Sequence, residues 1–586
     1  MKRYRIHSPI EKAHPLIEKY GSFLAQLLFN RGIEAEKDAE RFLTPQWEQV
    51  HDPFLMRGME KAVERVRDAI LNEERILIYA DYDADGVPGA VILSEFFEKL
   101  SHQNYEIYIP HRHNEGYGMR SEVVEDFIAR GGSLVISIDV GIRAFDAVAT
   151  CNTHNVDCII TDHHLPEKRE EKEVLPPAYA ILDPKREGDT YPFNELCGSG
   201  VIFKFIQAFL QRYREDFSVN EGWEKWLLDM VGIATLSDMV PLQDENRLFA
   251  SFGMRVIREV ITKRGKRDGL RFLALDAGIH PQFFTEEDIT FGITPRINAA
   301  SRMTHAREAL RVFKEAPQDE MQVYVEWLSS INNERKKQVR DFEKEARVLL
   351  EKGTQEDILF IGSDHWSPGI LGLIASKLLN TFSLPVFVWG GEGERVKGSV
   401  RSSTIPLSYF MENGAFPSSC EFGGHREAGG FSCAREDLSS FEEELRRLAR
   451  EWGETHQEEE LIIPIDMELS PEEVQQERYE EMRKLAPFGI GNGKPLFLIR
   501  SVVIEDAGEF GKEKNHFELA FRNRFGKRVR GIAFFQTRKS FHEIFEGKSY
   551  DLVAHIEHSV FRGRHELRLR IIDLFPSAER EERVIE

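Results

Sequence analysis

Short apolar runs alternate with helical patterns along residues 59–245. Four of these runs, at residues 76–78, 134–138, 158–161 and 231–237, end at an aspartate or at an Asp-His-His triplet. Runs of this length are typical of buried strands, and strands that alternate with helices form parallel sheets. Because the carboxyl ends of parallel strands meet at one edge of a sheet, the pattern predicts an α/β domain with acidic side chains gathered at that edge.

The remaining patterns predict a chain of several domains. At 586 residues the chain is longer than one hydrophobic core usually serves. The predicted parts are a helical lead-in at 1–58, an α/β catalytic domain at 59–315, a connecting helix at 316–352, a second α/β domain at 353–455 and an all-β domain at 460–576.

The predicted connecting helix carries charged residues with apolar residues spaced along one side, and Gly353 is expected to end it. The second α/β domain has strand-like residues at 358–362 and 385–389 on either side of a helix at 369–379. The last domain contains strand-like residues at 498–504, 516–522 and 565–573, which predict a small β-barrel.

The amino terminus is too polar for a signal peptide, and no apolar run reaches membrane-spanning length. We therefore expect a cytoplasmic protein without a membrane partner. The five cysteines include no Cys-x-x-Cys pair, so we expect them to be reduced and structural rather than part of a disulfide framework or a zinc site.

The formal net charge of −22 would by itself argue against a nucleic-acid partner, because affinity for phosphate comes mainly from Lys and Arg. Part of the acidity lies in short runs such as Glu458 to Glu460, which are expected to be solvated. The predicted barrel is locally basic. Its basic residues are Arg522, Arg524, Lys527, Arg528, Arg530, Arg562, Arg564, Arg568 and Arg570, and they are interleaved with Phe521, Phe525, Phe534, Phe535 and Phe561. Such a mixture can follow a phosphate backbone and stack bases, although some of these rings are expected to be barrel core.

The acidic edge has the composition of a site for two hard divalent cations. Carboxylate oxygens suit Mg²⁺ and Mn²⁺, and Mn²⁺ also accepts imidazole. Two such ions can activate water, polarise a phosphoryl oxygen and stabilise the leaving oxygen. The predicted metal ligands are Asp81, Asp83, Asp85, Asp139, His163 and Asp238.

Within this set, Asp139 is the candidate bridge between the ions. Asp83 and Asp85 are assigned to different ions, and His163 with Asp238 completes the second one. Taken alone, each residue has a simpler explanation. An Asp-rich loop before a glycine is usually a solvated turn, and a single Asp often caps a helix. Their joint occurrence at strand ends favours the metal site.

These motifs resemble the DHH phosphoesterases, whose name-giving motif matches Asp162-His163-His164. Among them the bacterial RecJ single-strand-specific exonucleases are most similar, over nearly the whole chain. The resemblance also includes residues 109–112 with Glu115-Gly116-Tyr117-Gly118, residues 295–303, residues 398–402, Gly423-Gly424-His425, and residues 485–492 before an OB-fold.

The resemblance implies a DHH domain and a DHH-associated domain joined by a long helix and followed by an OB-fold. It implies 5′→3′ degradation of single-stranded DNA to mononucleotides with two Mn²⁺ or Mg²⁺ ions, in recombination and repair. Catalytic roles are implied for Asp139, His163, His164 and His425. Substrate-binding roles are implied for Arg112, Arg296, Asn298, Arg302, Ser399, Arg401, Gly424 and His425, with Arg302, Ser399 and Arg401 at the 5′ phosphate.

By the same resemblance, a helicase and a single-strand-binding protein are plausible partners of a monomeric enzyme. Two alternatives remain open. One is a nanoRNA or cyclic-dinucleotide phosphodiesterase of the same superfamily, which would not need the barrel. The other is a non-catalytic DNA-binding replication factor, in which the metal ligands would be eroded.

Overall fold

The computed structural model describes residues 2–263, 267–350, 357–456, 462–511, 514–541, 544–561 and 564–585. The chain divides into two compact units. One unit comprises residues 1–50, 239–251 and 460–586, and the other comprises residues 51–238 and 252–459. Gly353, Glu458 to Glu460 and Arg562 lie outside the described residues.

The larger unit contains a parallel five-stranded sheet in the order β3-β2-β4-β5-β8. Its strands are β2 (Ile76–Ala80), β3 (Tyr105–Tyr108), β4 (Leu134–Ile138), β5 (Asp157–Thr161) and β8 (Ala180–Leu182). Every residue of β2 and β4 is buried. That burial explains their continuous apolar sequences, because helices cover both faces of a parallel sheet.

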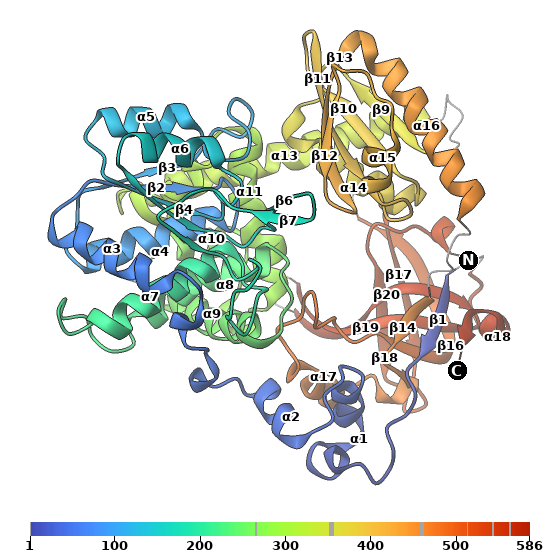
Figure 1. Ribbon diagram of the computed structural model, residues 1–586. Coiled ribbons are helices and arrows are strands. Elements are labelled where there is room, and N and C mark those ends of the chain that lie inside the picture. Colours follow the sequence, from blue (N-terminus) through green and yellow to red (C-terminus); the bar gives the residue numbers. More distant parts are fainter. Residues whose placement is uncertain are drawn as a thin grey trace. The chain divides into compact units, whose positions relative to one another are not determined.

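Helices α5 (Ser121–Ala129) and α6 (Phe145–Thr153) pack on one face of this sheet, where Phe127 and Val148 join the strand side chains Tyr79 and Val135 in one core. Helices α3 (Met59–Leu71), α4 (Gly86–Lys99) and α7 (Gly198–Tyr213) cover the other face (Figure 1). A short hairpin, β6 (Glu167–Arg169) and β7 (Lys172–Val174), follows β5.

The prediction of a strand at residues 231–237 is wrong. These residues belong to helix α8 (Leu228–Ser237), which is buried on all sides. A short apolar run without polar positions fits a buried helix as well as a buried strand, and periodicity alone cannot separate the two. Asp238 therefore follows a helix end and not a strand end.

The polypeptide continues through α9 (Asp244–Thr262), α10 (Asp268–Asp276), α11 (Thr294–Met303) and α12 (Arg307–Leu310) into the long helix α13 (Met321–Leu350). Helix α13 packs along α10 and α11 and also contacts β9 and α14 of the domain that follows. It therefore joins the two α/β domains of this unit.

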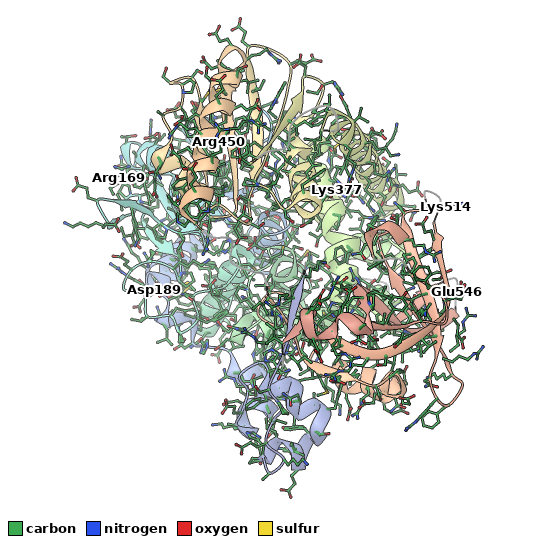
Figure 2. All side chains as sticks on the ribbon, turned by 90° about the vertical axis from the view of Figure 1, so that its right-hand side faces the viewer. Arg169, Asp189, Lys377, Arg450, Lys514 and Glu546 are labelled. Atoms are coloured by element: carbon green, nitrogen blue, oxygen red, sulfur yellow. A yellow bond between two sulfur atoms is a disulfide. The ribbon has the colours of Figure 1, made fainter. Side chains whose placement is uncertain are left out.

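The second α/β domain has a mixed sheet in the order β12-β13-β11-β10-β9. The strands are β9 (Leu359–Ser363), β10 (Val386–Gly390), β11 (Arg395–Arg401), β12 (Glu421–Gly424) and β13 (Ala428–Ala434). Helices α13 and α14 (Leu371–Phe382) share one buried core with the sheet, and α15 (Leu407–Asn413) and α16 (Leu438–Thr455) share another. Arg450 of α16, labelled in Figure 2, is exposed and pairs with Asp357 at 3.6 Å.

The expectation that all five cysteines are reduced is wrong for one pair. Cys420, directly before β12, forms a disulfide with Cys433 of β13. The antiparallel pairing of these strands brings the two residues together, and no sequence motif indicates such a pairing. Cys151, Cys158 and Cys197 are free and buried.

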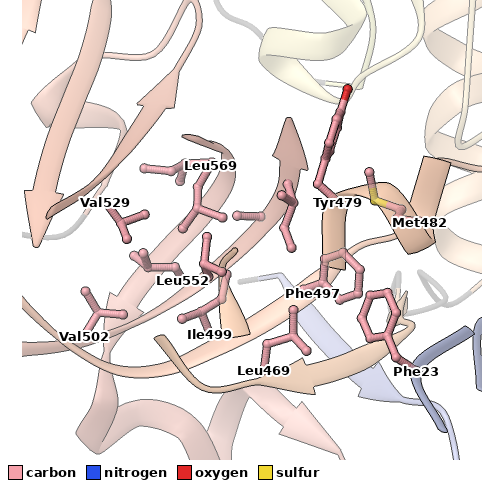
Figure 3. Close-up of a cluster of buried hydrophobic side chains, with 14 of the residues drawn as sticks. Phe23, Leu469, Tyr479, Met482, Phe497, Ile499, Val502, Val529, Leu552 and Leu569 are labelled. Atoms are coloured by element: carbon pink, nitrogen blue, oxygen red, sulfur yellow. The ribbon is translucent and has the colours of Figure 1, made fainter. Parts of the chain in front are cut away.

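The smaller unit contains a closed β-barrel formed by β16 (Phe497–Phe510), β17 (His516–Arg522), β18 (Arg528–Ala533), β20 (Arg564–Pro576) and β19 (Ser549–Phe561), with β19 pairing back to β16. Strand β15 (Met467–Leu469) extends the sheet beside β16. Helices α1 (Pro15–Phe29) and α17 (Gln476–Arg483) add Phe23 and Met482 to the barrel core, and Phe23 stacks on Phe497 at 5.8 Å (Figure 3).

Both ends of the chain join this unit. Strand β1 (Arg3–Ile6) lies between β14 (Ile462–Ile465) and β21 (Val584–Ile585) in a three-stranded parallel sheet. Helix α2 (Glu36–Leu43) follows α1, and α18 (Arg580–Arg583) precedes β21. The amino-terminal segment therefore contributes a strand as well as helices.

The structure confirms the predicted fold class, two α/β domains joined by a long helix and a C-terminal barrel of the OB type. None of the described helices is long and apolar enough to cross a membrane.

A buried ion-pair network fastens two helices whose ends carry predicted metal ligands. Arg267 donates to both carboxylate oxygens of Glu95 on α4, at 2.9 and 3.0 Å, and to the buried Asp229 on α8. Helix α4 begins directly after Asp85, and α8 ends directly before Asp238. The network therefore holds two walls of the acidic edge.

We expect Arg267→Met to destabilise the larger unit by about 3–5 kcal/mol, because Asp229 would remain buried without its partner. Differential scanning calorimetry would report the loss as a lower Tm. Lys263→Met is the control, since the pair of Lys263 with Glu259 is exposed and should contribute less than about 1 kcal/mol. Equal Tm values for the two variants would contradict this role of Arg267.

Candidate metal centre and nucleic-acid interface

The loops at the carboxyl edge of the β3-β2-β4-β5-β8 sheet deliver the predicted metal ligands. Asp81 follows β2, and Asp83 and Asp85 lie in the turn that leads into α4. Asp139 follows β4, and the Asp162-His163-His164 motif follows β5. Asp238 arrives from the end of α8. All predicted metal ligands therefore belong to one region of one domain.

The structure brings these side chains close enough together for several of them to bind the same ion. The Nε2 atom of His163 lies 3.1 Å from Oδ1 of Asp139, 3.6 Å from Oδ2 of Asp238 and 3.9 Å from Oδ2 of Asp85. Three groups have their candidate ligand atoms within 4.8 Å of one another. They are Asp81 with Asp83 and Asp139, Asp85 with His163 and Asp238, and Asp139 with His163 and His164.

Asp139 is the carboxylate that two of these groups share, and Asp83 and Asp85 fall into different groups. A carboxylate has two oxygens and can bridge two ions. The geometry is therefore compatible with the predicted division of ligands, and the assignment of each ligand to an ion stays a prediction.

The buried polar atoms at the centre fit a cation. Oδ1 of Asp81, Oδ1 of Asp139 and Nε2 of His163 are buried and make no hydrogen bond within the described part of the chain. Buried polar atoms are normally satisfied, and oxygen-rich donor sets with an imidazole suit Mn²⁺ and Mg²⁺. The residues present are thus suited to hold such ions.

The pKa values at the centre record how strongly the carboxylates repel one another. Burial and the charge of Asp85 raise the pKa of Asp139 well above its usual range, and burial and Asp83 do the same to Asp81. Burial and neighbouring aspartates raise the pKa of Asp85 to about 6 and that of Asp238 to about 9. A bound cation would relieve this repulsion.

Asp162 organises the two histidines, a role that the sequence did not assign to it. Its Oδ1 accepts the N–H of His163 at 2.8 Å and Nδ1–H of His164 at 2.8 Å, and its Oδ2 accepts the N–H of Ile142 at 2.9 Å. Burial opposes charge on His164, but the bond to Asp162 and nearby carboxylates raise its pKa to about 9. Burial and the charge of His164 instead lower the pKa of His163 to about 3. The two neighbouring imidazoles are therefore suited to different tasks, His163 as a neutral ligand and His164 as a charged donor.

The amino terminus of α7 holds Asp85. The Asp85 carboxylate accepts hydrogen bonds from the N–H groups of Gly198 at 2.6 Å and Ser199 at 2.7 Å. The Ser199 hydroxyl donates to the Asp85 carbonyl at 2.6 Å. Unpaired N–H groups and the helix dipole favour an anion at this position. This contact is not among those predicted from the sequence, where its signal would have been the Gly-Ser-Gly triplet at the start of an apolar helix.

Close approach of Gly198 to Asp139 also limits the space at the centre. A Cβ atom on Gly198 would lie 2.5 Å from Cβ and 2.8 Å from Cα of Asp139. Asp139 itself has a φ of 60°, a left-handed conformation that non-glycine residues adopt mainly where the surroundings impose it. Its position is therefore set by backbone packing on both sides.

Arginine side chains form a second cluster, beside α11 and the second α/β domain. Arg302 donates to the Gly369 carbonyl at 3.1 Å, and Arg112 lies over the Tyr82 ring at 4.6 Å. Burial and the charges of Arg112 and Arg335 lower the pKa of Arg302 to about 9, which shows that like charges meet there. An anion would stabilise this cluster.

Ser399 and Arg401 of β11 complete the arginine cluster. A Cβ atom on Gly372, in the first turn of α14, would lie 3.1 Å from both Ser399 Oγ and an Arg401 guanidinium nitrogen. The first turn of a helix offers free N–H groups and a favourable dipole to phosphate. A neighbouring cavity of about 510 Å³ is lined in part by Arg112, Lys397 and Gly423. Arg335 of α13 is not among the predicted site residues, and its Nε is buried and unpaired within the described residues.

Other predicted substrate-binding residues have different surroundings. Arg296 donates to Ser329 at 2.9 Å and to Asp276 at 3.4 Å, so its charge is already partnered. Asn298 accepts the N–H of Ala84 at 2.9 Å and thereby supports the aspartate turn. Gly424 and His425 are exposed at the turn between β12 and β13. Their roles toward substrate stay predictions.

The barrel exposes aromatic side chains between charged ones. Phe525 is 72% and Phe535 is 81% exposed, whereas Phe521 is buried in the core. Arg568 lies 5.5 Å from the Phe534 ring, and Arg528 pairs with Asp506 at 3.0 Å. Part of the basic density is therefore neutralised locally, and the exposed rings remain available for stacking.

Replacing Gly198 by alanine should disturb the metal centre without unfolding α7. We expect Gly198→Ala to weaken Mn²⁺ binding roughly 10- to 100-fold in calorimetric titration, because the added methyl group would displace Asp139. Gly200→Ala is the matched control in the same helix, where the nearest atom lies 3.5 Å away and alanine favours the helix. Wild-type affinity in Gly198→Ala would contradict the argument.

The raised pKa values predict a pH-dependent stability without metal. Asp85 and Asp238 have folded-state pKa values of about 6 and about 9, above the value of about 3.9 for an unfolded chain, so the folded state binds more protons. Their contribution is complete below about pH 4 and is lost as the pH rises through those values.

We therefore expect the Tm of the metal-free protein to fall between about pH 4 and about pH 9, and added Mn²⁺ to raise the Tm most at the upper end. Thermal unfolding across this range with and without Mn²⁺ is the measurement. Asp238→Asn should flatten the metal-free slope, and a metal-free Tm that rises with pH would disprove the account.

Three family models match the chain, each in a different domain. The DHH family N-terminal domain matches residues 75–235, the DHHA1 domain matches residues 355–451 and the RecJ OB domain matches residues 465–573. These ranges correspond to the parallel-sheet domain, the second α/β domain and the barrel.

The single-stranded-DNA-specific exonuclease RecJ of Bacillus subtilis is 35% identical over 511 residues, which are 85% of this chain and 61% of the relative. The chain thus spans less than two thirds of that relative's length. The structure of RecJ from Thermus thermophilus with Mn²⁺ is similar in fold, with a TM-score of 0.79 at 24% identity over 98% of this chain and 79% of that one.

A structure of exonuclease RecJ bound to manganese has a TM-score of 0.56 at 28% identity and covers 67% of this chain and 95% of that one. The order of the three matched domains, the site at the sheet edge and these relatives agree with the resemblance found in the sequence. Domain by domain and over most of its length, the chain is therefore similar to RecJ exonucleases of the DHH type.

Proposed function

We propose that this protein is a metal-dependent exonuclease that degrades single-stranded DNA from its 5′ end and releases mononucleotides, in recombination and repair. The observation that carries the proposal is the position of the acidic centre beside an arginine cluster in the same unit. Asn298 and Arg302 lie on the same helix, and Asn298 binds the aspartate turn while Arg302 belongs to the arginine cluster. The chain therefore offers one site for cations next to one for a phosphate.

Asp81, Asp83, Asp85, Asp139, His163 and Asp238 would hold two divalent cations, Mn²⁺ or Mg²⁺. When bound, such a pair activates water and stabilises the charge that develops on a phosphodiester during hydrolysis. A family member 28% identical to this chain was solved with manganese. The imidazole of His163 among the carboxylates is a donor that Mn²⁺ accepts readily.

The protein's own groups would position the strand. A terminal phosphate carries more charge than an internal one, and Arg302, Ser399 and Arg401 at the first turn of α14 offer fixed donors for it. A pocket that accepts a chain end fixes the direction of degradation, because only the 5′ end carries a phosphate there. Arg112 would line the path between this pocket and the aspartate turn.

His164 would donate to the scissile phosphate. Its Nδ1–H is committed to Asp162 at 2.8 Å, so the other ring nitrogen, Nε2, is left to face substrate. In the metal-free protein, the bond to Asp162 and the nearby carboxylates raise the pKa of His164 to about 9, which favours a protonated donor. His425 remains a second candidate for contact with the scissile phosphate.

The barrel would bind the unpaired strand, because exposed rings such as Phe525 and Phe535 can stack bases that a duplex keeps paired. A cytoplasmic location, a monomeric state and partnership with a helicase or single-strand-binding protein belong to the same proposal. They follow from the family resemblance, since a nuclease of this kind needs an unpaired 5′ end.

A phosphodiesterase for nanoRNA or cyclic dinucleotides is less well supported, because such an activity gives the barrel no role. A non-catalytic DNA-binding factor is also less well supported, because every predicted metal ligand is present and gathered at one centre.

The first test uses single-stranded and duplex DNA labelled at the 5′ or the 3′ end, with Mn²⁺. We expect the 5′ label to appear at once as mononucleotide from single strands only, and Asp139→Asn to reduce the rate at least roughly 100-fold. Hydrolysis of short RNA or cyclic dinucleotides with DNA left intact would favour the phosphodiesterase, and binding without hydrolysis would favour the DNA-binding factor.

A matched pair of substrates tests the direction of degradation. Arg401→Ala should weaken binding of a 5′-phosphorylated strand by about 1.5–3 kcal/mol and leave a 5′-hydroxyl strand nearly unaffected, because only the former has the charge that Arg401 would bind. Equal losses on both strands would place Arg401 elsewhere on the path.

A further inference from the structure

Tyr117 is an exposed aromatic residue at the acidic centre, and the proposed function gives it no role. It belongs to the Glu115-Gly116-Tyr117-Gly118 segment between β3 and α5. Its side chain is 54% exposed. Exposure of a large ring beside buried carboxylates requires an explanation.

The contacts of Tyr117 place its hydroxyl inward. The hydroxyl lies 3.4 Å from the carbonyl oxygen of Asp139 and 3.2 Å from Nδ1 of His164. The Tyr117 and His164 rings meet edge to face, with their centroids 5.7 Å apart. A surface tyrosine usually buries its ring and leaves its hydroxyl in water. Here the hydroxyl reaches the centre and much of the ring remains in solvent.

The segment around Tyr117 is anchored on both sides. The Glu115 carboxylate accepts from the Tyr108 hydroxyl and from the His111 N–H, and the Tyr79 hydroxyl of β2 donates to the Gly118 carbonyl at 3.0 Å. Gly116 and Gly118 have φ values of 78° and 110°, which favour glycine and orient the residue between them. The ring is thus presented from a fixed position.

Tyr117 and the arginine cluster contact different residues of the acidic centre. Arg112 stacks on Tyr82, and Asn298 of α11 binds Ala84, so the cluster approaches through the turn at 82–84. Tyr117 instead reaches it through Asp139 and His164. Because His164 is the proposed donor to the scissile phosphate, a base next to that phosphate would lie within reach of the Tyr117 ring.

We propose that the exposed ring of Tyr117 is a stacking platform for the nucleobase just beyond the scissile phosphate, which is the second base from the 5′ end. The inference rests on the proposed function. Stacking accepts any base because every base has a π face, so this contact would position the strand without reading its sequence. The hydroxyl, held near Asp139 and His164, would fix the ring relative to the reacting phosphate.

The test uses single-stranded DNA with 2-aminopurine at the first, second or third position from the 5′ end, and Ca²⁺ in place of Mn²⁺ to allow binding without cleavage. Stacking quenches the fluorescence of this base. We expect wild-type protein and Tyr117→Phe to quench the second position most, and Tyr117→Ala to lose that quenching. Affinity of Tyr117→Ala should fall about 5- to 150-fold, as for other single stacking contacts.

An abasic site at the second position separates stacking from a purely structural role. If the ring holds a base, the abasic strand should bind wild type and Tyr117→Ala equally, because the partner is missing in both. A structural role would leave Tyr117→Ala weaker on the abasic strand as well, which would overturn the inference. Trp226→Ala, at an aromatic residue that is 48% exposed and contributes nothing to the metal groups, is the control and should quench as wild type does.

The outcomes distinguish this inference from the proposed function. If the wild-type protein releases mononucleotides with Mn²⁺ and Tyr117→Ala still quenches the second base with Ca²⁺, the stacking role alone is rejected. Wild-type protein that neither binds nor cleaves single-stranded DNA would reject both.

Discussion

Mutual repulsion among buried carboxylates is the constraint on which the rest of this protein depends. Asp81, Asp85 and Asp139 are buried where they converge with the partly exposed Asp238, and burial and neighbouring charge raise the pKa of each. Such a cluster is unfavourable unless protons or cations neutralise it. The fold must therefore supply enough rigid contacts to hold the carboxylates in place.

Those contacts come mainly from backbone groups and buried ion pairs. The first N–H groups of α7 hold Asp85, Gly198 lets α7 approach Asp139, and Arg267 fastens α4 to α8. Asp162 aligns the histidines by accepting three hydrogen bonds from them, two from backbone N–H groups and one from the His164 ring. Each contact acts on a predicted ligand, on a neighbouring histidine, or on a helix whose end carries a predicted ligand, so the surroundings of the centre are as specific as its ligands.

Charge is segregated over short distances, which reconciles a net charge of −22 with the anionic substrate that we propose. The carboxylates meet on one side of the turn at 82–84, and Arg302, Arg335 and Arg401 gather by α11, α13 and β11. On the barrel several arginines already pair with acids, as Arg528 does with Asp506, and exposed rings remain between them. The local arrangement, and not the total charge, decides what can bind.

The sequence by itself determined the α/β class, the long connecting helix, the barrel and the residues of the acidic centre. Those features depend on local patterns, because a strand followed by aspartates has the same appearance wherever the sheet lies. Only the tertiary structure decided that residues 231–237 are helical, that Cys420 joins Cys433, and that Asp162, Gly198 and Ser199 support the centre. It also decided that Arg296 is partnered, that Arg335 lies near Arg302, and that the Tyr117 hydroxyl reaches Asp139 and His164. These outcomes depend on contacts between side chains that are far apart in the chain. Periodicity and composition describe only local sequence, so they do not specify such contacts.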